Sequence, residues 1–135
     1  MGTHMAMKGI GTLSLPKPGQ KPGWYFVTVP KDVGLYYKSL SKIHWNECLN
    51  GPHISFTSGE KENRIVTNDE IFPFLGNVEF FYDWPLYTNG RSFWMKVTCP
   101  RLSQIRQILG LPPHPIGFHL TLGNVKGILN PFNPS

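Results

Sequence analysis

Two short segments of the sequence carry the same pair of reactive side chains. GPHISF contains His53 and Ser55, and GFHLTL contains His119 and Thr121. An imidazole titrates near neutral pH, so it can accept or donate a proton. A hydroxyl group can hydrogen-bond the non-bridging oxygens of a phosphate and stabilise the charge that grows there during reaction. Two such pairs in one site would suit acid–base cleavage of a phosphodiester without a metal ion.

Both segments have the alternating pattern of a half-buried β-strand. Successive side chains of a strand point to opposite faces, so His53 and Ser55 share one face while Ile54 and Phe56 share the other. The second segment alternates in the same way. We therefore expect each strand to bury its apolar face and to present an imidazole and a hydroxyl on the opposite face, with the two polar faces meeting across one cleft.

The sequence around the two segments is also repeated. VTVPK at 27–31 precedes the first and VTCPR at 97–101 precedes the second, with a helical pattern and a loop containing Gly or Pro in between. One His-x-[Ser/Thr] pair is weak evidence, because a single histidine often does no more than bond local backbone. The matched contexts favour a duplicated strand–helix–strand unit that places both histidines in one site.

The elements that must position these residues follow from hydrophobic periodicity and turn signals. Strands are expected over 24–29, 53–56, 78–84, 92–99 and 118–122, and helices over 32–45 and 102–109. Thr67 and Glu70 have the spacing of a capping box for a short helical turn. Residues 9–23 are expected to form an apolar patch followed by a proline-broken loop, and 85–90 a turn. The predicted class is α+β.

Length and composition exclude several classes of protein. The chain has 135 residues, 40% of them hydrophobic, which is enough for one domain with a real core. We interpret residues 1–6 as an expression-tag remnant and 7–135 as a single domain. No apolar run reaches the roughly 18 residues that span a bilayer, and no signal peptide is visible. We therefore expect a cytoplasmic protein with no membrane partner.

Charge and cysteine content limit the kinds of ligand and cofactor that we expect. A formal net charge of +5 attracts phosphate-bearing ligands, but no block of Lys and Arg resembles an arm that binds long nucleic acid. Cys48 and Cys99 are too few for a disulfide framework and lack metal-ligand spacing, so we expect two reduced thiols. Neither histidine motif has metal ligands at suitable spacing, and we expect no metal and no other cofactor.

Two H-x-[S/T] motifs on duplicated halves resemble the 2H phosphoesterase superfamily, and the resemblance runs from about Trp24 to Leu122. More narrowly, the stretches KPGWYFVTVPKDVGLYY, GPHISF and GEKENRIVT are similar to the phage anti-CBASS phosphodiesterases (the anti-CBASS protein one family). That family degrades the cyclic oligonucleotide messengers of bacterial CBASS immunity.

The resemblance implies a bilobal 2H phosphoesterase-like fold, in which two pseudo-twofold related β-α-β units with antiparallel sheets surround a central cleft. It implies metal-independent cleavage of 3′–5′ bonds in cyclic di- or trinucleotides, in the cytoplasm of the infected host. The family's catalytic pairs correspond to His53 with Ser55 and to His119 with Thr121. Ser55 stands where family members often have Thr, and contacts made by their C-terminal residues are not carried over. The sequence leaves open which histidine is the acid and which the base.

One group of aromatic residues could bind a nucleobase. Trp84, with Tyr82 and Tyr87 nearby, is expected at the end of a strand beside a turn, where its ring could stack on a base; packing in an aromatic core is the alternative. Tyr36 and Tyr37 are interpreted as core residues on a helix face.

Other polar candidates have weaker support. Three lysines could hold phosphates or could be solvated surface cations: Lys38, Lys42 and Lys126. His44 and Cys48 have helical spacing, but a zinc site would need two more ligands.

Three other functions remain open at this stage. A 2′,3′-cyclic phosphodiesterase acting on RNA ends would use the same four residues, and a substrate panel separates it from the cyclic-nucleotide enzyme. A non-catalytic sponge would bind cyclic nucleotides and release them intact. A basic RNA-binding module would show a steep salt dependence and no turnover.

Overall fold

The structure is a computed structural model, and it describes residues 7–17, 20, 23–41, 46–47, 51–57, 65–114 and 117–124. The side chains of Ser41, Asn46, Glu47 and Trp84 are outside this description. The strands are β1 (Met7–Leu13), β2 (Phe26–Thr28), β3 (Asn46–Glu47), β4 (His53–Ser55), β5 (Gly76–Thr88), β6 (Ser92–Thr98) and β7 (His119–Asn124). The helices are α1 (Lys31–Ser41), α2 (Asn68–Ile71), the 3-10 turn η2 (Phe72–Phe74) and α3 (Pro100–Ile108).

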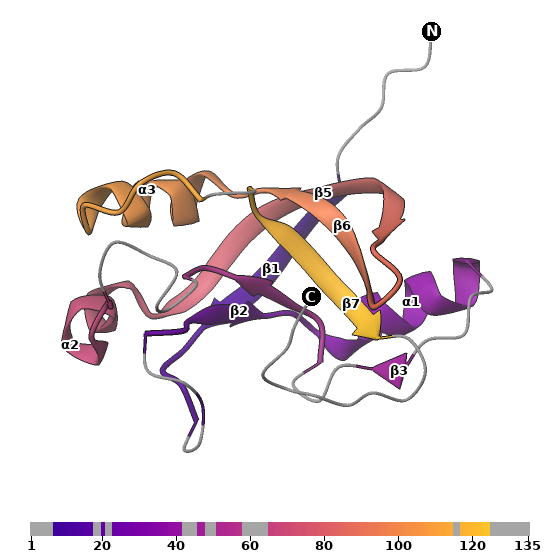
Figure 1. The fold of residues 1–135 in the computed structure, drawn as a ribbon, viewed down its shortest axis with the longest axis horizontal. Coiled ribbons are helices and arrows are strands. Elements are labelled where there is room, and N and C mark those ends of the chain that lie inside the picture. Colours follow the sequence, from indigo (N-terminus) through magenta and orange to yellow (C-terminus); the bar gives the residue numbers. More distant parts are fainter. Residues whose placement is uncertain are drawn as a thin grey trace, which may run out of the picture.

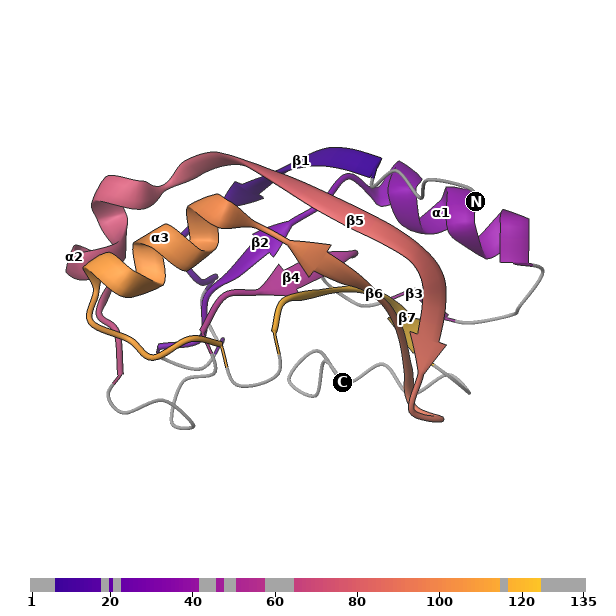
Figure 2. The ribbon, with the colours of Figure 1, turned by 90° about the horizontal axis from the view of Figure 1, so that it is seen from above.

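The strands form one antiparallel sheet that closes into a barrel (Figure 1). The strand order is β3-β7-β4-β2-β1-β5-β6, and β6 also pairs with β7. The closed ring therefore runs β1-β2-β4-β7-β6-β5 and returns to β1, with the short β3 attached to β7. In both Figure 1 and Figure 2, α2 and α3 lie at one end of the sheet and α1 at the other. The expected α+β class is confirmed.

The ring has a symmetric plan about the boundary between β4 and β7. On one side of that boundary the order is β4-β2-β1, and on the other it is β7-β6-β5. Helix α1 connects β2 towards β4, and α3 connects β6 to β7. The expected strand–helix–strand order thus occurs twice, and its two histidine strands are neighbours. They lie side by side in one sheet rather than facing each other across a cleft.

The barrel interior is filled by the apolar face that the strand alternation predicts. Fully buried side chains from six of the strands and two of the helices form one cluster that includes Leu13, Val27, Ile54, Ile71, Phe80, Met95, Leu102, Ile105 and Leu120. Alternate residues of β4 and β7 supply Ile54 and Leu120, which are opposite each other in the ladder. Because the apolar face of each strand is buried inside the barrel, the opposite face, with its polar residues, lies on the outside.

The largest departure from the sequence prediction is β1. Residues 7–13 form a full strand paired with β5 and β2, although we expected the stretch from Gly9 onward to be an apolar patch leading into a loop. Two glycines face the interior: a Cβ at Gly9 would lie 2.5 Å from the Phe80 ring, and a Cβ at Gly11 would lie 2.4 Å from Val27 Cγ1. Glycine is present because large side chains of neighbouring strands fill that space.

A second departure concerns β5, which continues to Thr88 through the expected turn at 85–90. Asp83 is opposite Lys96 and Leu86 is opposite Met95, so Trp84 and Pro85 are extra residues between consecutive partners. A bulge of this kind accommodates a proline, which has no N–H for the ladder. Trp84 is thus inside a bulged strand, and not at a strand end as predicted.

The helices agree with the sequence pattern in part. Helix α1 is described from Lys31 to Ser41, and the rest of the expected helix, 42–45, lies outside the described residues. Tyr37 is in the core as expected, but Tyr36 is 59% exposed, so its interpretation as a core residue is wrong. The predicted capping box is confirmed, with Thr67 as N-cap of α2. None of the helices described here is long and apolar enough to cross a membrane.

A buried arginine joins α3 to the end of β4. Arg106 is 2% exposed. It donates from Nη1 to the Phe56 carbonyl at 2.9 Å, and from Nε and Nη2 to the Pro112 carbonyl at 3.1 and 2.7 Å. Hydrogen bonds from a charged donor are among the stronger ones in proteins. The second half of the chain therefore holds the strand that carries His53.

Candidate active site

The four residues predicted from the motifs lie together on the outer face of the barrel. In the β4–β7 ladder His53 is directly opposite Thr121, and Ile54 is opposite Leu120. Continuing the same antiparallel register brings Ser55 opposite His119. Directly opposed side chains have Cβ atoms about 5 Å apart, and diagonal neighbours such as the two histidines are about 7–8 Å apart. Imidazoles at that separation are close enough to contact the same phosphate.

A glycine two residues before each histidine has the same conformation in both halves. Gly51 has φ of 73° and Gly117 has φ of 75°, in the left-handed region that favours glycine. A Cβ at either position would meet nothing within 4 Å, so conformation, and not space, favours glycine there. Each glycine carbonyl bonds the following histidine ring. In both halves the Gly-x-His segment therefore orients its imidazole through a hydrogen bond from the ring to the glycine carbonyl.

His53 is held in one tautomer. Its Nδ1 lies 2.9 Å from the Gly51 carbonyl oxygen, which is an acceptor only, so Nδ1 must carry the proton. The ring is 4% exposed, and its Nε2 is buried with no hydrogen-bond partner. An unpaired buried nitrogen is costly. The backbone bond of Nδ1 to Gly51 therefore satisfies only one of the two ring nitrogens.

Burial disfavours the charged form of His53. Burial lowers the pKa of its imidazole below the ordinary value, the bond to Gly51 opposes that effect, and the charge of nearby His119 lowers the pKa further. The influence of His119 on the pKa of His53 agrees with their diagonal placement. A neutral imidazole with an available lone pair is the form that a general base requires.

His119 is more open than His53. Its side chain is partly exposed. Burial lowers the pKa of its imidazole as well, while the hydrogen bond to the Gly117 carbonyl raises it. The Trp94 ring lies 5.8 Å from the His119 ring, at an interplanar angle of 52°. Because His119 is less buried than His53, burial disfavours its charged form less.

The second half also supplies Trp94 and Lys96, which the sequence analysis did not select. In the β6–β7 ladder Trp94 is opposite Thr121 and Lys96 is opposite His119. Tyr87 of β5 stacks on Trp94 with ring centroids 6.3 Å apart, and the Lys96 ammonium lies 5.2 Å from the Tyr87 ring centroid. The period of two in SFWMKVT puts Trp94 and Lys96 on one face, but only the register places them beside His119.

The first half has counterparts at the same ladder positions. Thr28 is opposite His53 and Phe26 is opposite Ser55. The ring centroids of Phe26 and His53 are 5.5 Å apart, close to the 5.8 Å between the ring centroids of Trp94 and His119. By position in the ladder, Thr28 therefore corresponds to Lys96. The sequence repeat aligns Thr28 with Thr98 instead. The sequence alignment and the ladder correspondence therefore differ by two residues.

Other predicted residues are not brought to this face by anything described. Trp84 is in the β5 bulge, next to Asp83, and its side chain is outside the description. Lys38 belongs to α1. The remaining candidates lie outside the described residues: Lys42, His44, Cys48 and Lys126. Cys99 is a buried thiol with no disulfide, and burial raises its pKa.

The described groups have the chemistry of phosphodiester cleavage. Two differently buried imidazoles can exchange protons, two hydroxyls can bond phosphate oxygens, and a lysine contributes positive charge. Among the residues that the structure describes, no group of three His, Cys, Asp or Glu side chains could hold a metal ion. In comparisons with known proteins, no family model, no curated protein and no solved structure matches the chain.

Proposed function

We propose that the protein is a phosphodiesterase that cleaves 3′–5′ bonds of cyclic di- or trinucleotides by metal-independent acid–base catalysis. The observation that carries the proposal is the pair of Gly-x-His segments on adjacent strands, which place two oriented imidazoles and two hydroxyls at neighbouring ladder positions. A lone histidine bonded to backbone would be ordinary structure. Two in matched registers, one with a buried, unpaired Nε2, favour a ligand.

His53 is the base in this mechanism. Its Nε2 lone pair removes the proton from a ribose 2′-hydroxyl, and the 2′-oxygen attacks the adjacent phosphorus. The bond from phosphorus to the 5′-oxygen breaks, and a 2′,3′-cyclic phosphate forms. Burial favours the neutral ring that this step requires, and the bond to Gly51 fixes the tautomer.

His119 is the acid. It gives its proton to the departing 5′-oxygen, and its more open position next to the Trp94 ring supports the cationic form. The hydroxyls of Ser55 and Thr121 and the ammonium of Lys96 hold the non-bridging oxygens, where negative charge grows. Water opens the cyclic phosphate afterwards, with the roles of the two histidines exchanged.

Aromatic rings next to the phosphate site suit nucleobases. The stacked Tyr87–Trp94 pair offers a surface beside Thr121, and base stacking on such rings contributes about 1–3 kcal/mol per base. Trp84 is proposed to stack a base as well. Its place in the bulge next to Asp83, which is opposite Lys96, supports this role.

The biological part of the proposal comes from the sequence resemblance. We propose a bilobal 2H phosphoesterase fold, with each strand–helix–strand unit as one lobe and the β4–β7 boundary as the floor of the site. The substrate would be a cyclic oligonucleotide messenger of CBASS immunity. The protein would then act in the cytoplasm of an infected bacterium and help a phage evade that defence.

The test is incubation of the purified chain with cyclic dinucleotides, cyclic trinucleotides and linear RNA ending in a 2′,3′-cyclic phosphate, with products identified by mass spectrometry. Parallel reactions contain excess EDTA. We expect linear products from at least one cyclic ligand, first with cyclic-phosphate ends, at a rate that EDTA does not change. The catalytically inactive control is the double variant His53→Ala/His119→Ala.

Other outcomes would select another function. Turnover of linear RNA ends alone would favour the 2′,3′-cyclic phosphodiesterase. A cyclic ligand that binds and is recovered intact would favour the sponge. Loss of cleavage in EDTA that a divalent cation restores would contradict the acid–base mechanism.

A further inference from the structure

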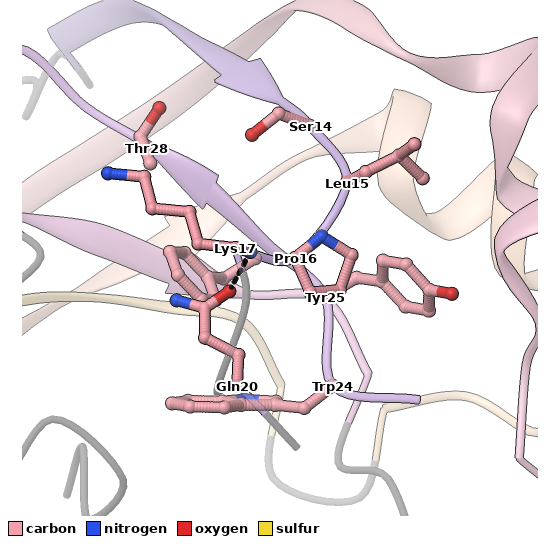
Figure 3. Close-up of a pocket in the computed structure, with 9 residues that line it drawn as sticks. Ser14, Leu15, Pro16, Lys17, Gln20, Trp24, Tyr25 and Thr28 are labelled. Atoms are coloured by element: carbon pink, nitrogen blue, oxygen red, sulfur yellow. Dashed lines mark hydrogen bonds between the residues drawn. The ribbon is translucent and has the colours of Figure 1, made fainter. Parts of the chain in front are cut away.

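A small pocket lies next to the candidate active site, on the side of β2 (Figure 3). Its volume is about 40 Å³, room for a few water-sized groups. Phe26 and Thr28 line it, and these residues are opposite Ser55 and His53 in the β2–β4 ladder. The Phe26 ring, 5.5 Å from the His53 ring, therefore lies between the pocket and the catalytic histidine.

The polar groups of the pocket are suited to an anion. Lys17, Gln20 and Ser14 line it, and among its described lining residues none is acidic. Gln20 Oε1 accepts a hydrogen bond from the Lys17 backbone N–H at 2.8 Å, which leaves the amide nitrogen as its donating end. Figure 3 shows the Lys17 side chain extending towards Thr28. An ammonium, an amide and hydroxyls together bind phosphate oxygens well.

The walls of the pocket are held in place before any ligand binds. The Thr57 hydroxyl donates to the Gly23 carbonyl at 2.6 Å and accepts from the Tyr25 N–H at 2.9 Å, so it fixes the backbone on both sides of Trp24. The Trp24 and Phe26 rings pack at 5.2 Å. Gln20 N–H also bonds the Lys17 carbonyl at 3.1 Å, a second hydrogen bond between these two residues. A site prepared in this way loses less entropy on binding.

We infer that this pocket is a subsite for a second phosphate of the same substrate, with Lys17 as its cation. The inference rests on the proposed function. The reacting phosphate lies over β4 and β7, and the pocket lies over β2, one to two strand spacings away, or about 5–10 Å. One ribose separates successive phosphates of a nucleotide chain, and its reach is of this order. The site would therefore favour ligands with two phosphodiesters over nucleoside cyclic monophosphates.

Two substitutions test the subsite. Lys17→Gln removes the charge, and Gln20→Glu keeps an oxygen for the Lys17 N–H while placing a negative charge against the ligand. The control is Lys8→Gln on β1, which removes the same charge from a residue paired with Glu79 at 3.5 Å. The probes are cyclic di-AMP, cyclic di-GMP and cyclic GMP–AMP, with adenosine and guanosine 2′,3′-cyclic monophosphates for comparison.

Binding of every probe is measured by calorimetry, and turnover by product analysis. We expect Lys17→Gln to raise Kd and KM for the best dinucleotide about twofold to fivefold, as for one exposed charge contact, with kcat unchanged. Gln20→Glu should raise both values at least as much. Neither pocket variant should change Kd or KM for the monophosphates. Lys8→Gln should change neither quantity for any probe.

Dinucleotide binding that both pocket variants leave unchanged would overturn the subsite, whether or not the ligand is cleaved. Equal weakening for monophosphates would show that Lys17 acts on the reacting phosphate, and would overturn it too. Turnover of monophosphates alone would contradict the subsite and leave the acid–base chemistry standing. Absence of both binding and turnover would contradict the proposed function itself.

Discussion

The two halves of the barrel orient their histidines in the same way and surround them differently. In the first half His53 is 4% exposed, next to Phe26 and opposite Thr28. In the second half His119 is partly exposed, next to Trp94 and opposite Lys96. The shared device is Gly-x-His on neighbouring strands, and the differences are burial, ring type and charge.

That difference explains how a symmetric frame can support an asymmetric reaction. Proton abstraction needs a neutral imidazole, and deep burial favours the neutral form. Protonation of a leaving group needs a cationic imidazole, which a more open position beside an indole tolerates. In the proposed mechanism, the cation for phosphate binding is Lys96 in the second half. On the first side, Lys17 lies in the pocket beside β2.

The largest expected effects separate the two histidine roles. His53→Ala and His119→Ala should each lower kcat about 10²–10⁴-fold, the usual contribution of a general acid or base. A substrate with p-nitrophenol in place of the 5′-leaving group needs no acid. It should restore most of the rate of His119→Ala and little of the rate of His53→Ala. Restoration of the His53 variant instead would reverse the assignment.

Substitution of the paired glycines tests whether their conformation orients the rings. Gly51→Ala and Gly117→Ala should each lower the free energy of unfolding by about 1–2 kcal/mol, because alanine is strained at positive φ. They should also lower kcat about tenfold or more, since a shift of the histidine misaligns the reacting atoms. Urea denaturation and steady-state kinetics measure the two effects.

Gly110→Ala is the matched control for the glycine variants. Gly110 follows α3 and also has φ of 73°. The Gly110→Ala variant should therefore lose similar stability but keep full activity. A proportional loss of activity in all three variants would mean that strain lowers activity through stability alone.

Burial of the histidines should make the fold sensitive to mild acid. Burial lowers the pKa of both His53 and His119 below the ordinary value of 6.5. As the pH falls below 6.5, the unfolded chain therefore binds protons before the folded chain does. The free energy of unfolding should be highest above pH 6.5 and fall below it, by at most about 1.4 kcal/mol per pH unit for each histidine.

Urea unfolding at pH 7.5, 6.5 and 5.5 measures this slope. The variant His53→Gln/His119→Gln removes both groups and should flatten the curve between pH 6.5 and 5.5. A slope that the double variant leaves unchanged would show that other groups cause it.

The smallest expected effect comes from making the second half resemble the first. Lys96→Thr gives β6 the residue that β2 has at the corresponding ladder position, Thr28. Loss of one exposed charge should raise KM about threefold to fivefold, with the effect reduced at high salt. Lys8→Thr on β1 is the control, and an equal change in both variants would indicate net charge alone.

The sequence predicted the local part of the site well. The period of two in HISF and HLTL correctly placed His53 with Ser55 and His119 with Thr121, because alternation depends only on the strand itself. The repeat predicted that the two polar faces would meet across a cleft, whereas β4 and β7 pair side by side in one sheet. Its alignment of Thr28 with Thr98 was two residues away from the ladder correspondence, since register is set by packing across the sheet.

What the sequence could not predict depends on long-range contacts. Glycines are rare in strands, so β1 was not expected; its two inward glycines make sense only beside Phe80 and Val27. Closure of the barrel requires β1–β5 and β6–β7 pairing between distant parts of the chain. Lys96 was missed for the same reason, because nothing local to β6 indicates that His119 lies beside it.

The central claim is that His53 and His119 act as a pair on one phosphate. The most direct test is a double-mutant cycle on the kcat of cyclic dinucleotide cleavage, with folding of each variant checked by circular dichroism. If the histidines cooperate, the double alanine variant should be little slower than the slower single variant, since either loss already disables the proton-transfer pair. Single effects that multiply in the double variant, or a double variant with near-normal cleavage, would contradict the account.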